Sequence, residues 1–162
     1  MKKGQRNQLT RQVGEHLVTA ELGRRGLVAT PFAGNVPDFD LVAVGASGKA
    51  VPIQVKAING GAWQFNAATF LEIEFDGPVQ RATSLKKLSD PDLLCVFVLL
   101  GEDNASDRFF IFPWKVIQKL CKKRYGTEYR RPRNPKLTHF AVRPPDLEEF
   151  EGDWERVARA TA

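Results

Sequence analysis

The fold of this chain is decided by residues 36–57, whose sequence is VPDFDLVAVGASGKAVPIQVKA. Two apolar segments, 37–44 and 51–56, are joined there by the glycine-rich link GASGK at residues 45–49. Such a link is typical of a turn. Polar and apolar residues alternate in the second segment, as expected for a strand with one buried face. The stretch therefore predicts a hairpin of two antiparallel strands.

The residues before this hairpin predict a helix and another strand. Apolar side chains recur at helical spacing between residues 8 and 25, and Gly26 follows as a helix terminator. Residues 27–32 then form a short apolar segment of the strand type. We expect the three strands to form a meander that follows one helix.

The second half of the chain continues with strand and helix patterns. The run from Leu93 to Leu100 is apolar throughout, which is typical of a strand buried on both faces. A helix that begins near Pro113 has an apolar stripe with lysines on the opposite side. Further elements are expected as strands at 108–112 and 137–142, helices at 78–88 and about 146–160 (the latter acidic), and a segment at 63–75 that fits either type. The patterns predict the α/β class in a single domain, residues 1–162.

Charge is distributed unevenly along the sequence. The chain has 24 Lys+Arg and 19 Asp+Glu and a net charge of +5, but residues 108–143 alone carry +10, with Glu128 as their single acid. Basic residues interleaved with Tyr125 and Tyr129 suit a phosphate backbone, because each neutralised phosphate releases counterions. A solvated helix face followed by a charged loop is the alternative. The candidate nucleic-acid contacts are Lys115, Lys119, Lys122, Lys123, Arg130, Arg131 and Arg133.

Four polar residues form a candidate site. Glu15 lies in the first predicted helix, Asp40 in the first strand of the hairpin, and Gln54 and Lys56 in the second strand. Gln54 and Lys56 share a strand face, and pairing of the two strands would bring Asp40 beside them. A lysine in a strand with the pattern of a buried one needs a partner, and a carboxylate is the simplest. Asp40 as a turn cap or a metal-free partner of Lys56, and Glu15 as a solvated acid, are the alternatives.

In these residues the chain resembles the PD-(D/E)XK nuclease superfamily, and within it the archaeal Holliday-junction-resolvase-like and small restriction-endonuclease-like branches. The resemblance covers residues 8–60: the helix GEHLVTAELGRRG at 14–26, the acidic strand, and the triplet Gln54-Val55-Lys56. The rest of the chain agrees only in the order of its elements. The resemblance implies a restriction-endonuclease-like α/β core, with a central mixed sheet flanked by helices.

The resemblance also implies a metal site. In such nucleases a strand carboxylate and the acid of the triplet hold Mg²⁺, and the lysine of the triplet positions or deprotonates the attacking water. Here Asp40 would be the principal ligand, Glu15 a ligand directly or through water, and Lys56 the catalytic lysine. Mn²⁺ is the expected substitute metal. The acidic region 26–107 would contain the metal centre, and the basic region 108–143 would bind flanking phosphates.

The chain departs from the family pattern at Gln54, where an acid is usual. The amide oxygen of Gln54 can still bind a metal, but it supplies no negative charge. Metal affinity is therefore expected to fall unless Glu15 compensates. Asp38, which follows a proline at the strand entry, is expected in a turn rather than as a ligand. Glu21 is the alternative to Glu15.

The sequence and the resemblance together predict a Mg²⁺-dependent endodeoxyribonuclease that hydrolyses DNA phosphodiester bonds. A non-catalytic nucleic-acid-binding module and a protein-interaction domain on the same fold are the alternatives.

The environment and assembly of the chain are also predicted. The longest apolar run has eight residues, where a membrane-spanning helix needs about 20. We expect no membrane association and a cytoplasmic protein, with Cys95 and Cys121 as buried reduced thiols. Related nucleases often pair to cut both strands, so a homodimer is considered, with Trp63, Phe65 and Phe70 as its candidate surface.

Overall fold

The computed structural model describes residues 3–32, 38–103, 106–126, 134 and 136–162. Contacts between residues divide the chain into two compact units. Unit one contains residues 1–61, 93–113 and 144–162, and unit two contains residues 62–92 and 114–143. Each unit is described by itself.

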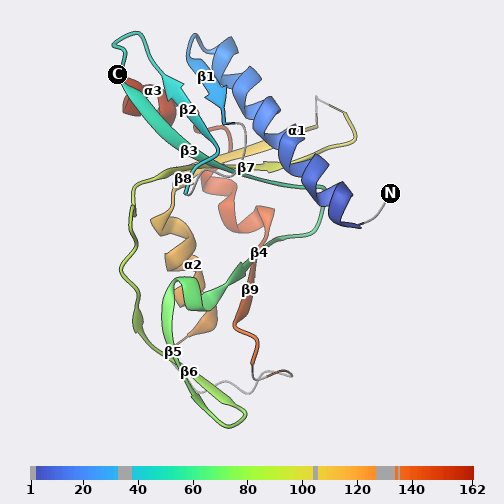
Figure 1. The fold of residues 1–162 in the computed structure, drawn as a ribbon, viewed down its shortest axis with the longest axis vertical. Helices are drawn as coiled ribbons and strands as arrows, with labels where there is room; N and C mark the ends of the chain where they lie inside the picture. Colours follow the sequence, from blue (N-terminus) through green and yellow to red (C-terminus); the bar gives the residue numbers. More distant parts are fainter. Residues whose placement is uncertain (1–2, 33–37, 104–105, 127–133, 135) are drawn as a thin grey trace. The chain divides into compact units, whose positions relative to one another are not determined.

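Unit one is built on a five-stranded mixed sheet (Figure 1). Its strands are β1 (Val28–Pro31), β2 (Leu41–Val44), β3 (Ala50–Ile58), β7 (Leu94–Leu99) and β8 (Arg108–Pro113), in the order β1-β2-β3-β7-β8. Neighbouring strands are antiparallel except β3 and β7, which are parallel. The helices of the unit are α1 (Lys3–Arg24), the 3-10 helix η2 (Pro144–Phe150) and α3 (Glu155–Thr161). The predicted α/β class, with a mixed sheet flanked by helices, is confirmed.

The core of unit one follows the alternation seen in the sequence. Ile53 and Val55 of β3 are buried, whereas Gln54 and Lys56 between and after them are half-buried. Ile53 and Val55 belong to one apolar cluster with Val18 of α1 and Val157 of α3. Strand β7 is buried over almost its whole length, as its uninterrupted apolar run predicts. The predicted meander is confirmed as β1-β2-β3.

Helix α1 packs on β3 at a glycine. A Cβ atom added at Gly14 would lie 2.5 Å from the Cβ of Ala57, closer than real Cβ contacts. Ala57 is on β3, one residue beyond Lys56. The absence of a side chain at Gly14 therefore lets α1 approach β3, the strand that carries Gln54 and Lys56. Glu15 is the next residue on the helix, so it lies near this point of close approach.

Strand β8 is joined to the segment after η2 by a paired arginine and glutamate. Arg108 donates to Glu151 through Nε at 2.8 Å and Nη2 at 2.6 Å. The hydrogen bond from Arg108 lowers the pKa of Glu151 below its ordinary value, and the positive charge of Arg108 acts in the same direction. Glu151 therefore binds a proton more readily in the unfolded chain than in the folded one.

This pair predicts a pH-dependent contribution to stability. The contribution is complete above the ordinary glutamate pKa of about 4.3 and is lost as the pH falls through the lower folded-state value. Both side chains are more than a third exposed, so we expect Glu151→Gln to cost at most about 1 kcal/mol at pH 7. Urea unfolding of both proteins between pH 7 and 3 measures the cost, and a cost that stays constant over this range would contradict the prediction.

Within its described residues, unit two contains two small sheets, one α-helix and one 3-10 helix. Strands β4 (Trp63–Asn66) and β9 (His139–Val142) form an antiparallel pair, and β5 (Leu71–Asp76) and β6 (Val79–Leu85) form a hairpin. The 3-10 helix η1 (Ala67–Thr69) lies between β4 and β5 along the chain, and α2 (Lys115–Tyr125) is the α-helix of the described part of the unit. Aromatic rings form its core: Phe65 lies 5.4 Å from Phe140 and 6.0 Å from Trp114, centroid to centroid.

Two predicted helices are wrong. Residues 79–85 form strand β6 instead of part of a helix, because Gly77 and Pro78 make a two-residue hairpin loop and Gly77 has a φ of 53°. The expected acidic helix at 146–160 is instead η2 followed by the short helix α3. The segment 63–75, left open by its pattern, is mainly strand.

The described residues contain no helix that is long and apolar enough to cross a bilayer. Cys95 and Cys121 are both buried, as predicted.

Candidate metal and active site

Asp40 is the centre of the candidate site. It immediately precedes β2, and only 5% of its side chain is exposed. Its Oδ2 accepts the backbone N–H of Val55 at 2.8 Å and also the side-chain amide of Gln54. A buried carboxylate needs such donors, because burial without hydrogen bonds disfavours the charged form. The two contacts fix the Asp40 carboxylate against β3.

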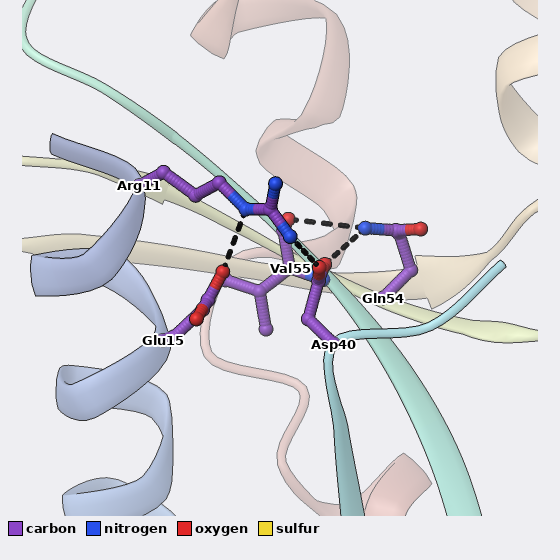
Figure 2. Close-up of polar contacts among 5 residues, drawn as sticks. All are labelled: Arg11, Glu15, Asp40, Gln54 and Val55. Atoms are coloured by element: carbon purple, nitrogen blue, oxygen red, sulfur yellow. Dashed lines mark hydrogen bonds and ion pairs between the residues drawn. The ribbon is translucent and has the colours of Figure 1, made fainter. Parts of the chain in front are cut away.

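Arg11 connects Asp40 to helix α1 (Figure 2). Its Nη2 donates to Asp40 Oδ1 at 2.8 Å, and its Nε donates to Glu15 Oε1 at 2.8 Å. The hydrogen bond to Glu15 raises the pKa of Arg11, burial opposes this, and the charges of Asp40 and Glu15 add to the increase. Arg11 is therefore a permanent cation placed between two carboxylates.

The structure places Glu15, Asp40 and Gln54 near one another, with Gln54 in direct contact with Asp40 and Glu15 linked to it through Arg11. The side chain of Glu15 is 13% exposed, so it is not simply a solvated acid. Gln54 contacts Asp40 directly, and Lys56 follows two residues later on the same face of β3. Lys56 is half-buried in the strand. The hairpin of β2 and β3 and one turn of α1 thus carry all four predicted residues, and contacts to Asp40 are made by Gln54 directly and by Glu15 through Arg11.

The oxygen atoms of Glu15, Asp40 and Gln54 suit a hard cation that takes only some of its ligands from the protein. No group of three or more His, Cys, Asp or Glu side chains within the described residues is arranged to hold a metal ion. Glu15 and Asp40 already share one cation, the guanidinium of Arg11. Mg²⁺ commonly uses one or two carboxylates and keeps several waters, so two carboxylates and the Gln54 amide suit it. The amide of Gln54 now donates to Asp40 and would have to rotate to offer its oxygen.

The alternative acids have other environments. Asp38 is exposed and has a φ of 72°, a turn conformation in which its side chain type is tolerated. Glu21 pairs with Arg24 at 2.8 Å and with Arg25 at 2.5 Å. Glu21 therefore belongs to a separate ion cluster near the end of α1, while Glu15 shares Arg11 with Asp40.

The predicted basic contacts belong mostly to α2 in unit two. Lys119, Lys122 and Lys123 are exposed on this helix, and Ile117 and Cys121 are buried on its other side. Lys115 forms an ion pair with Asp92 at 2.5 Å, so part of its charge is neutralised. Arg130, Arg131 and Arg133 lie outside the described residues.

Two aromatic expectations are corrected by burial. Tyr125 is 3% exposed and its hydroxyl donates to Gln80, so it is part of the unit-two core and is not available to a nucleic acid. Tyr129 lies outside the described residues. Trp63 and Phe70 are also buried in unit two, and they cannot form the exposed dimer surface considered from the sequence. The dimer itself stays a prediction.

Sequence reasoning missed Arg11. Its only signal was its place four residues before Glu15, the spacing of an ion pair on one helix face. Such pairs are common on solvated helices, so the spacing alone does not indicate contact with Asp40, 29 residues further along the chain.

Comparisons with known proteins support the fold. No protein-family model matches the chain, and no curated protein matches its sequence. A similar solved structure is that of a bacterial homing endonuclease, I-Ssp6803I, with a TM-score of 0.52 and 13% sequence identity. The likeness covers 94% of this chain and 93% of the homing endonuclease. At this identity the similarity establishes an endonuclease-like fold and nothing finer.

Proposed function

We propose that this protein is a metal-dependent DNA endonuclease of the PD-(D/E)XK type. The observation that carries the proposal is the arrangement around Asp40: a buried strand carboxylate beside Gln54, with Glu15 linked to it through a cation. The fold, shared with a homing endonuclease, supports the same conclusion. DNA is the proposed partner and the cytoplasm the proposed location.

The residues of the site divide the work between binding and proton transfer. Asp40 and Glu15 would hold Mg²⁺, or Mn²⁺ in its place, with the Gln54 amide oxygen as a neutral third donor. When bound, the metal supplies charge stabilisation at the scissile phosphate and a more acidic water. Lys56, on the same strand face as Gln54, would orient the attacking water and stabilise the negative charge that develops on the phosphate. The β2–β3 hairpin keeps these groups in register.

The position of Gln54 favours a second candidate, a module that binds DNA without cutting it. Its side-chain amide donates to Asp40 and adds no negative charge to the site. A site with two carboxylates binds a divalent cation more weakly than one with three. With this second function, the protein would bind DNA with the same dependence of affinity on salt concentration but would leave the phosphodiester bond intact.

Incubation with supercoiled plasmid separates the two candidates. The native protein is expected to nick or linearise plasmid in Mg²⁺ or Mn²⁺ but not in EDTA, and Lys56→Ala is expected to abolish the cleavage while retaining DNA binding. Absence of cleavage on plasmid, junction and single-stranded substrates, with binding intact, would instead establish the non-catalytic module.

The exposed lysines of α2 are the proposed contacts to the phosphate backbone. Replacing Lys119, Lys122 and Lys123 with alanine is expected to reduce the slope of log K against log salt by up to about 3, because each phosphate contact contributes about 0.9. The slope is measured by fluorescence anisotropy with labelled duplex DNA at salt concentrations from about 50 to about 200 mM. Alanine preserves helix propensity, so α2 should remain folded.

A charge-matched triple variant provides the control. Arg24, Arg156 and Arg159 are each paired with an acid in unit one, and their replacement by alanine removes the same charge. This control should change the salt slope little. An equal effect of the two triple variants would show that net charge, not the lysine face of α2, governs binding.

A further inference from the structure

Arg11 occupies the place where a cation bound by Glu15 and Asp40 would lie. Its guanidinium contacts one oxygen of each carboxylate, both at 2.8 Å, and Figure 2 shows it between the two side chains. The other oxygen of Asp40 is held by Val55 and Gln54. Arg11 therefore uses the carboxylate oxygens that face the space between α1 and the β2–β3 hairpin.

A divalent cation and Arg11 cannot both make these contacts. Two positive groups on the same pair of carboxylate oxygens would repel each other strongly in a site where Asp40 is almost fully buried. The charges also favour an exchange, since two carboxylates carry two negative charges and Arg11 neutralises only one. A divalent ion would match both.

We propose that Arg11 is a positioning residue that holds the metal-free site in shape and must leave the Asp40 carboxylate before a divalent metal can bind. The inference rests on the proposed metal-dependent function and adds a step to it. In the metal-free protein, Arg11 keeps two like-charged carboxylates close together. On metal binding, its guanidinium moves away from Asp40 and the metal takes its contacts.

The surroundings allow Arg11 to move while Asp40 stays. Half of the Arg11 side chain is exposed, so water can solvate the released guanidinium. Asp40 remains anchored by the backbone N–H of Val55, which does not depend on how the Gln54 amide is turned. The backbone of Glu15 is placed by α1, which packs on β3 through Gly14. Departure of Arg11 therefore exposes the anchored carboxylate of Asp40, with Glu15 carried beside it on α1.

Competition by Arg11 lowers the apparent affinity for the metal. When only a fraction of the molecules has the binding-competent conformation, the apparent dissociation constant rises by the inverse of that fraction. If Arg11 is released in about a tenth of the molecules or fewer, its removal tightens metal binding by about tenfold or more. A residue with only a structural role would have the opposite effect, because its loss would loosen the site.

Calorimetric titration of the full chain with MnCl₂, without DNA, tests the proposal. The native protein is compared with Arg11→Gln, which removes the charge but keeps a helix-compatible side chain, and with Arg11→Lys, which retains one cation without the guanidinium fork. Arg24→Gln is the matched control, because Arg24 pairs with Glu21 on the same helix. Thermal unfolding without metal accompanies each titration.

Arg11→Gln is expected to bind Mn²⁺ most tightly, by about tenfold or more over the native protein. Arg11→Lys should have the next highest affinity, and Arg24→Gln should bind Mn²⁺ as tightly as the native protein does. Arg11→Gln should also melt at a lower temperature without metal and gain more from saturating Mn²⁺. Equal or weaker Mn²⁺ binding by Arg11→Gln, with native binding detected, would overturn the role of Arg11 and leave the proposed function standing. No Mn²⁺ binding by any of the four proteins would overturn both.

Discussion

Replacing Asp40 with asparagine is expected to lower the rate of Mg²⁺-dependent DNA cleavage by about 10²-fold to 10³-fold or more. The substitution keeps the size of the side chain and removes its charge. Asp40 is the most buried of the candidate ligands and the one that contacts both Gln54 and Arg11. An asparagine there would weaken metal binding and also place an amide against the donors that the carboxylate now satisfies.

Asp38→Asn is the matched control for this substitution. Asp38 lies two residues earlier, is exposed, and has the positive φ that asparagine tolerates as well as aspartate does. Cleavage by Asp38→Asn should stay within about twofold of the native rate, since surface substitutions seldom perturb a protein measurably. Steady-state cleavage of labelled duplex in Mg²⁺, with circular dichroism to verify folding, gives the comparison. Similar rates for Asp40→Asn and the native protein would exclude Asp40 as the principal ligand.

Gly14→Ala is expected to destabilise the protein, although alanine is the better helix former. The new Cβ would meet the Cβ of Ala57 at 2.5 Å, and overpacking of this kind costs about 1–3 kcal/mol. The gain in helix propensity, about 1 kcal/mol, offsets only part of this cost. Because Glu15 is the next residue on α1, displacement of the helix from β3 should also slow cleavage.

Gly23→Ala tests the same substitution at an open position of the same helix. No atom lies within 4 Å of a Cβ built at Gly23, so alanine should leave stability unchanged or increase it by up to about 1 kcal/mol. Urea unfolding of the two variants and the native protein measures the difference. If Gly14→Ala proved as stable as Gly23→Ala, the close approach of α1 to β3 would be wrong.

The elements that carry the site were the most predictable part of the fold. In β3 the alternation of Ile53 and Val55 with Gln54 and Lys56 indicated both the strand and its buried face. The apolar run of β7 indicated a strand buried on both sides. Local periodicity is sufficient in such segments because side-chain burial follows it directly.

Strand β6 shows where periodicity failed. Its buried residues are Gln80, which is polar, and Ala82, which is small. The alternation of buried and exposed residues in this strand therefore does not show in the sequence as an alternation of apolar and polar residues. Gln80 is buried because its amide donates to the Leu137 carbonyl at 3.0 Å and its oxygen accepts from Tyr125. These contacts join three segments far apart along the chain, and no local pattern contains them.

The candidate site likewise has residues that local sequence patterns indicate and one residue that they do not. Glu15, Asp40, Gln54 and Lys56 were found from their order and spacing, which a resemblance to known nucleases made specific. Arg11 was missed because its role depends on the packing of α1 against the hairpin, which places its guanidinium between Glu15 and Asp40. The charge of α2 was evident from composition, but the burial of Tyr125 on the same helix was not.

A crystal structure of the protein soaked in saturating Mn²⁺ tests the metal site most directly, because anomalous scattering identifies the ion itself. We expect an anomalous peak at metal–oxygen distance from Asp40 and Glu15, with the Gln54 amide oxygen turned toward it and Arg11 released from Asp40. Full Mn²⁺ saturation with no peak, and Arg11 still bonded to both carboxylates, would contradict the assignment of a metal-dependent active site.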